Sequence, residues 1–190
     1  NIPTNGLAPQ RIEETTRRIL SQIAGTGRPV ALTVKASLDG IGEVHDRIRG
    51  VKGNFERVLD ALERLKRLRE SDPNLHVEVG TVVSTANMHH VDELAAFVHS
   101  LGVESYRNEV AEQRAELFNR GDPITPSAEQ YRALMAGFAA RIRAETGHKR
   151  SLAQMTEAMR LVYYDTAARI LAEGRQVLPC YAGWSNAHTN

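Results

Sequence analysis

Apolar and polar residues alternate with a period of two in three stretches of the chain. This alternation predicts β-strands at residues 30–38, 76–83 and 103–108, and residues 2–4 can end a fourth. Apolar residues recur every three or four positions in the segments between them, which predicts helices at residues 9–24, 55–72 and 88–101. Because one helix connects each pair of strands, the strands are predicted to be parallel and the fold to belong to the α/β class.

Glycines and asparagines mark the predicted boundaries of these elements. Gly25 and Gly27 end the first helix, and Asn54 and Asn87 are predicted to be the N-caps of the next two helices. Residues 39–53 include four glycines, so we expect a loop between the first long strand and Asn54.

After residue 109 the pattern changes to helices alone. Thr125, with Pro126 at the first helical position, predicts a helix that ends at Gly147, and a second helix is expected over residues 151–173. The apolar residues predicted to face inward are Tyr131, Leu134, Met135, Phe138 and Ile142 in the first helix and Leu152, Met155, Met159, Val162 and Ile170 in the second. Methionines at helical spacing are more typical of core packing than of a cofactor site.

One face of the predicted sheet is polar. A parallel strand between two layers of helices should be apolar on both faces, yet the strand at residues 30–38 places Thr33, Lys35 and Ser37 on one face. The economical interpretation is a face that lines a solvated or ligand-filled lumen. A charge in the middle of a strand needs a partner, so we predict an ion pair between Lys35 and Glu78 on the next strand, with Glu104 as second choice.

The composition narrows the possible functions. In 190 residues, 24 Lys and Arg are balanced by 23 Asp and Glu, which argues against binding to nucleic acid or to an anionic membrane. No apolar run approaches the roughly 20 residues of a membrane span and no signal peptide is recognisable, so a cytoplasmic protein is expected. The single cysteine, Cys180, excludes an internal disulfide and an all-cysteine metal site built from this chain alone. Both ends of the chain look cut, which leads us to expect an internal fragment of a longer protein.

Four short blocks at the predicted strand ends resemble, in this order, the radical S-adenosylmethionine (radical SAM) enzymes. They are Thr-Asn-Gly at residues 4–6, Ser-Leu-Asp-Gly at 37–40 with the following stretch to 55, Thr-Val-Val-Ser-Thr-Ala-Asn at 81–87, and Tyr-Arg-Asn-Glu-Val at 106–110. In that family they would end strands 3–6 of a partial, TIM-like (β/α) barrel. Residues 179–183, Pro-Cys-Tyr-Ala-Gly, resemble the opening of the C-terminal iron–sulfur extension called SPASM. The resemblance therefore implies a partial barrel at residues 1–110, a helical linker region at 111–178 and the start of the extension at 179–190.

The resemblance also implies roles for individual residues. Ser37 would bond the ribose of SAM, Arg49 would lie near the SAM carboxylate, and the backbone at Val110 would meet the adenine. Cys180 would be the first ligand of an auxiliary [4Fe–4S] cluster, for which thiolate is a suitable soft ligand. No catalytic residue is assigned.

In this family a main [4Fe–4S] cluster reduces SAM, and the 5′-deoxyadenosyl radical abstracts hydrogen from a substrate. The substrate here is open, a small molecule or a peptide, and a reductant protein such as ferredoxin or flavodoxin is implied. The Cys-x3-Cys-x2-Cys loop that holds the main cluster is absent from the 190 residues, as is the Gly-Gly-Glu-Pro-like block. We therefore expect the longer parent to be the enzyme and this segment alone to be inactive.

Two other interpretations remain open. The chain could be a half-barrel of an unrelated (β/α) metabolic enzyme that binds a phosphorylated substrate, although Asp39, Glu43 and Asp46 in the glycine-rich segment would repel phosphate. It could also be a degenerate, non-catalytic barrel that binds peptides. The seven histidines show no metal-ligand spacing.

Overall fold

The computed structural model describes residues 1–113, 118–146 and 152–179. Two compact units make up the chain, the first at Asn1–Thr125 and the second beginning at Pro126. Cys180, and with it the predicted start of the iron–sulfur extension, lies outside the described residues. Among the described helices, none combines the length and the apolar character that crossing a membrane requires.

The first unit contains a sheet of four parallel strands. These are β1 (Ile2–Thr4), β2 (Leu32–Ser37), β3 (Leu75–Val83) and β4 (Ser105–Val110). They lie side by side in the order of the sequence, β1-β2-β3-β4, and every neighbouring pair is parallel. The predicted α/β class and the strand at residues 2–4 are confirmed.

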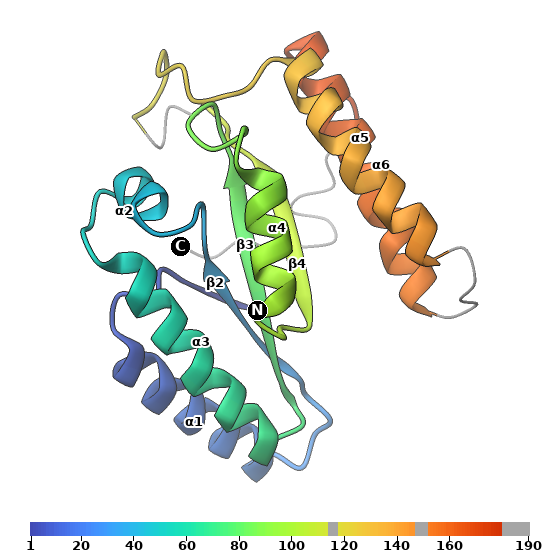
Figure 1. Ribbon diagram of the computed structural model, residues 1–190. Coiled ribbons are helices and arrows are strands. Elements are labelled where there is room, and N and C mark those ends of the chain that lie inside the picture. The colour runs from blue at the N-terminus through green and yellow to red at the C-terminus, as the bar shows by residue number, and fades with distance from the viewer. Residues whose placement is uncertain (114–117, 147–151, 180–190) are drawn as a thin grey trace. The chain divides into compact units, whose positions relative to one another are not determined.

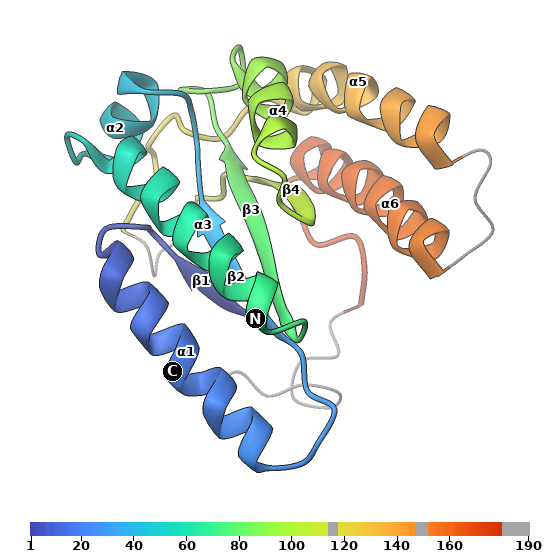
Figure 2. The same cartoon turned by 60° about the horizontal axis from the view of Figure 1, so that its bottom comes forward.

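Three helices of the first unit lie on the same face of this sheet (Figures 1 and 2): α1 (Pro9–Gly25), α3 (Asn54–Ser71) and α4 (Val91–Ser100). The apolar stripe of α3, including Val58, Leu62 and Leu65, is fully buried. Val34 on β2 and Val77 on β3 are buried on the face of the sheet that the helices cover. The core of this unit therefore lies between one face of the sheet and its helices.

The segment after β2 is helical, contrary to the prediction of a loop. A short helix, α2 (Glu43–Arg49), occupies its middle. The glycines that favoured a loop are the boundaries of this helix: Gly42 precedes it with φ 55°, and Gly50 ends it in the left-handed region with φ 68°. Glycine adopts a positive φ at little steric cost, so the same residues that suggested irregular backbone mark the two ends of a seven-residue helix of about two turns.

Both predicted asparagine caps are wrong. Asn54 is the first residue of α3, and Gly53 occupies the cap position. The free N–H groups of Gly53 and Phe55 are instead bonded by the carboxylate of Asp46, which comes from α2. α4 begins four residues after Asn87, which has a different role at the strand ends.

The second unit packs two helices together, α5 (Ala128–Thr146) and α6 (Leu152–Glu173). α5 does not open at Thr125: Ser127 and Gln130 form a capping box, in which the Ser127 hydroxyl accepts the Gln130 N–H at 3.2 Å and the Gln130 side chain accepts the Ser127 N–H at 2.9 Å. The predicted inward residues of α5 are confirmed, since those buried are Tyr131, Met135, Phe138 and Ile142; Leu134 is half-buried.

The inward face predicted for α6 is wrong. Met155, Met159 and Val162 are 59%, 66% and 63% exposed, and Ile170 is exposed as well. Among the α6 side chains that the structure describes, which do not include the predicted Leu152, those buried are Tyr164, Ala167 and Ala168. This face combines two alanines with Tyr164, which are less hydrophobic than the predicted Met and Val residues, so hydrophobicity alone assigned the wrong side of the helix.

Candidate ligand site at the strand ends

The two faces of the sheet differ in the way the sequence predicts. Val34 and Ala36 of β2 are buried on the helix-covered face, whereas Lys35 and Ser37 lie half-exposed on the other. The register places Ser37 of β2, Gly80 of β3 and Arg107 of β4 in one row across this second face, which we call the open face.

The ion pair of Lys35 corrects one prediction. Lys35 lies opposite Glu78 in the strand register, but its Nζ binds Glu109 Oε1 on β4 at 2.8 Å. Its side chain reaches β4 by crossing Gly80: a Cβ at that position would lie 3.1 Å from Lys35 Cδ. Because Gly80 has no side chain, the lysine can cross β3 diagonally instead of pairing with its direct neighbour.

The two glutamates considered as partners for Lys35 bind arginines. Glu78 Oε2 pairs with Arg107 Nε at 3.2 Å, and Glu104 Oε1 pairs with Arg69 Nη1 at 2.8 Å. The open face thus carries two cross-strand pairs of opposite charge, Lys35–Glu109 and Arg107–Glu78, whereas the Glu104–Arg69 pair connects the start of β4 to α3.

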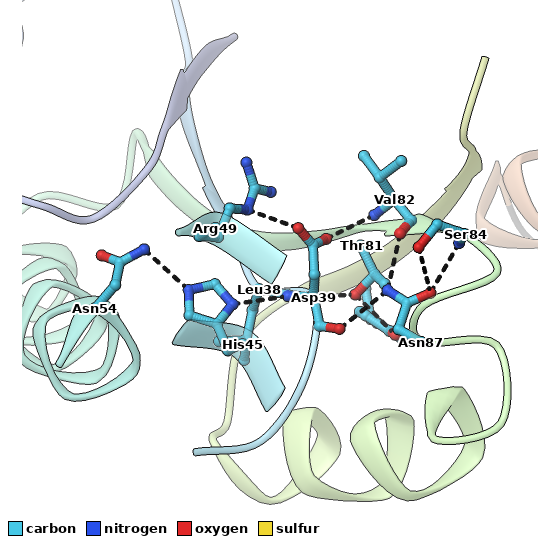
Figure 3. Close-up of polar contacts among 10 residues, drawn as sticks. Leu38, Asp39, His45, Arg49, Asn54, Thr81, Val82, Ser84 and Asn87 are labelled. Atoms are coloured by element: carbon cyan, nitrogen blue, oxygen red, sulfur yellow. Dashed lines mark hydrogen bonds and ion pairs between the residues drawn. The ribbon is translucent and has the colours of Figure 1, made fainter. Parts of the chain in front are cut away.

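Asp39, two residues after the end of β2, contacts several segments at the C-terminal ends of the strands (Figure 3). Its carboxylate is only 4% exposed, although it continues the open-face alternation of Lys35 and Ser37. Oδ1 accepts the N–H of Val82 at 2.9 Å, and Oδ2 lies 2.6 Å from Nε of Arg49. The Arg49 N–H does not point along this line, so the contact is a close ion pair without an aligned hydrogen bond.

The backbone of Asp39 is also fixed. Its N–H donates to His45 Nδ1 at 3.0 Å, and its carbonyl accepts from Asn87 Nδ2 at 3.0 Å. Asn87 is buried, donates also to the Val82 carbonyl at 2.9 Å, and accepts the Ser84 N–H at 2.8 Å. The N–H, the carbonyl and both carboxylate oxygens of Asp39 therefore each have a partner. These contacts connect the ends of β2 and β3 to α2.

His45 is fully buried and neutral. Burial lowers its pKa below 6.5, and the nearby Arg49 acts in the same direction, while Asp39 and Asp46 oppose the shift. Because Nδ1 accepts a hydrogen bond, the proton of the neutral ring lies on Nε2. Asn54 Nδ2 lies 3.1 Å from Nε2, and Asn54 Oδ1 has no hydrogen-bond partner. Exchanging the oxygen and nitrogen of this amide makes the oxygen the acceptor of the Nε2–H.

A second set of hydrogen bonds links β4 to the same edge. The Tyr106 hydroxyl donates to Thr81 Oγ1 at 3.0 Å, and the Thr81 hydroxyl donates to the Leu38 carbonyl at 2.6 Å. These side chains are buried, so polar groups as well as the ladder connect the start of β4 through Thr81 of β3 to the end of β2.

The structure brings three of the four predicted site residues to this edge of the sheet. Ser37 ends β2, Val110 ends β4, and Arg49 ends α2, where it contacts Asp39. Within the described part of the chain, the Ser37 hydroxyl and the two Nη groups of Arg49 make no hydrogen bond to protein. The side chain of Val110 alternates with Glu109 and so lies on the helix-covered side.

The sequence interpretation assigned no site role to Asp39 or His45 and took Asn87 as a helix cap. One signal was available for Asp39, because it extends the polar alternation of β2 by one step. The partners of His45 and Asn87 depend on contacts between segments that pattern analysis cannot place.

Comparison of the chain with protein-family models, curated proteins and solved structures finds no match. Over residues 1–113, 118–146 and 152–179, no three His, Cys, Asp or Glu side chains are grouped to hold a metal ion. The site at the strand ends, with its open hydroxyl and guanidinium donors, is suited to a polar ligand that carries an anionic group.

Proposed function

We propose that this chain supplies the SAM-binding strands of a radical SAM enzyme with a SPASM-type extension. The observation that carries the proposal is the position of Ser37 and Arg49. Both lie at the C-terminal edge of a parallel sheet, where ligands bind in α/β folds, and both have donors that the described protein leaves unused.

The topology supports a barrel origin. Strands in sequence order, all parallel, with helices on one face and polar residues on the other, are what a segment of a (β/α) barrel requires. We propose that β1–β4 correspond to strands 3–6 of the partial barrel, and that the open face is its inner face. An open sheet covered by helices on both faces would need apolar residues where Lys35, Glu78 and Arg107 lie.

The proposed roles follow the chemistry of each group. The Ser37 hydroxyl bonds the ribose of SAM, Arg49 receives its carboxylate, and the backbone at Val110 lies along the adenine. SAM held there by a reduced cluster would supply a 5′-deoxyadenosyl radical, with one electron from the cluster and methionine as the leaving group. The main cluster would be held by cysteines outside these 190 residues and reduced by a ferredoxin or flavodoxin, with Cys180 as an auxiliary-cluster ligand.

A binding titration tests the proposal. SAM is titrated into the isotope-labelled chain and backbone amide shifts are followed by NMR, with the expected shifts at residues 37–40 and 107–111. The double variant Ser37→Ala, Arg49→Ala should weaken binding by at least tenfold, about the value of one lost charged hydrogen bond. Arg47→Ala is the matched control, because Arg47 is exposed on the same helix.

Unchanged affinity for SAM in the double variant would show that the site is misassigned.

A second test uses the reading frame that encodes the chain. Three cysteines in the Cys-x3-Cys-x2-Cys spacing are expected upstream, and the anaerobically reconstituted parent protein should bind iron and sulfide. A parent without those cysteines would contradict the enzymatic proposal and leave the peptide-binding module as the better interpretation.

A further inference from the structure

The contact between Asp39 and Arg49 has a geometry that restricts how Arg49 can bind a ligand. The Nε atom of Arg49 is buried and lies 2.6 Å from Asp39 Oδ2. A guanidinium can bind a carboxylate side-on, through Nε and one Nη, or end-on, through both Nη groups. Because Asp39 covers Nε, only the end-on pair is open to a ligand.

Asp39 itself is held by groups other than Arg49. Its Oδ1 accepts the Val82 N–H, its N–H donates to His45, and its carbonyl accepts from Asn87. A carboxylate this deeply buried is costly unless it is paired, and here Oδ1 accepts a hydrogen bond while Oδ2 faces the Arg49 guanidinium. Asp39 is therefore a fixed anion, and the long arginine side chain is the movable partner.

We infer that Asp39 is a positioning residue that holds Arg49 so that its two Nη groups receive the ligand carboxylate end-on. The inference rests on the proposed function, since the ligand is SAM. Without Asp39, the Arg49 side chain could rotate about its bonds, and binding the ligand carboxylate would cost the conformational entropy of that side chain.

The test compares SAM with its decarboxylated analogue, binding to the 190-residue chain without a cluster, so that no iron contacts the carboxylate. The wild-type chain should prefer SAM. Asp39→Asn keeps an acceptor for Val82 N–H but can direct an amide N–H group toward Arg49, which releases the guanidinium. In this variant the affinity ratio of SAM to the decarboxylated analogue should be about tenfold smaller than in wild type, equivalent to about 1.4 kcal/mol. Its affinity for the decarboxylated analogue should stay within about twofold of wild type.

Ser37→Ala is the contrasting variant, because the loss of a ribose contact should weaken both ligands equally and leave the preference unchanged. If Asp39→Asn weakens both ligands equally, or neither, the positioning role is overturned while the proposed function stands. If the wild-type chain binds neither ligand, the proposed function is overturned and the inference with it.

A measurement on the wild-type chain keeps the inference testable if Asp39→Asn does not fold. Hydrogen exchange of the Arg49 Nε–H should be at least about tenfold slower than that of Arg47 Nε–H, since Nε of Arg49 is buried beside a carboxylate and Arg47 is exposed. Equal exchange rates would show that Arg49 is not held, and would overturn the inference.

Discussion

Replacement of Asn87 by alanine should destabilise the first unit strongly, although Asn87 lies in a turn. Its amide donates to the carbonyls of Asp39 at 3.0 Å and Val82 at 2.9 Å, and accepts the Ser84 N–H at 2.8 Å. The residue is only 1% exposed, so water cannot easily replace these bonds in the folded state. Asn87→Ala leaves three backbone groups without their partner.

The magnitude follows from the number of bonds. A hydrogen bond of this kind contributes roughly 1 kcal/mol net, and a buried group left unpaired costs about 1–3 kcal/mol, so the three lost bonds amount to about 3 kcal/mol. Typical domains have an unfolding free energy of about 5–15 kcal/mol, so the variant should lose a substantial part of its stability. Ser84→Ala removes only hydroxyl contacts of 3.3 Å and should cost less than about 1 kcal/mol.

Urea unfolding followed by circular dichroism measures both variants, with the m-value as a check that the same surface is exposed on unfolding. Asn87→Asp is the sharper variant, because it keeps the acceptor for Ser84 but directs a carboxylate oxygen at two carbonyls. It should be at least as unstable as Asn87→Ala at pH 7 and recover stability as the pH falls, since protonation restores one donor. A cost below 1 kcal/mol for both Asn87 variants would refute the reasoning.

Three further predictions concern the glycines and the buried histidine. Gly80→Ala should displace Lys35 from Glu109 and lower the free energy of unfolding in urea by about 1 kcal/mol. Gly137→Ala, where a Cβ meets no atom within 4 Å, should raise the free energy of unfolding by about 0.5–1 kcal/mol. Equal effects of the two variants would contradict the proposed path of Lys35. Gly6→Ala should cost about 3 kcal/mol or more, because φ is 74° and the new Cβ would lie 2.5 Å from Val58 Cγ2, while Gly27→Ala, with φ 65° and no neighbour, should cost only about 1 kcal/mol. The pKa of His45 is lowered in the folded state, so on acidification the unfolded state binds a proton at His45 at a higher pH than the folded state does. Stability should therefore fall as the pH drops below about 6.5, and it should depend less on pH in His45→Asn. Identical pH profiles for the two proteins would show that His45 is not the group responsible.

The sequence predicted those features of the fold that depend on local periodicity. The parallel strands, the polar alternation of β2 and the buried stripe of α3 all follow from the spacing of apolar residues, and the structure confirms them. The buried face of α5 was predicted for the same reason.

The failures share a different cause, namely a side chain whose partner lies on another element. Lys35 was assigned to its direct neighbour in the register, although Gly80 opens a longer path to Glu109. Asn54 was assigned to its own helix, although its amide is used by His45 and the helix is capped by Asp46. The α6 helix shows the same limit, because the side that packs carries Tyr164 and two alanines and not the more hydrophobic Met and Val residues.

The capping of α3 by Asp46 has a consequence for motion. α2 has seven residues, too few for a helix that is stable by itself in water, so its stability comes from the contacts of His45 and Asp46 with neighbouring segments. It should therefore open and close in one cooperative step with the first turn of α3, and their amide protons should exchange with a common rate. A ligand that contacts Arg49 at the end of α2 would slow that exchange in α3 as well, which makes the N-terminal turn of α3 a sensor of occupancy.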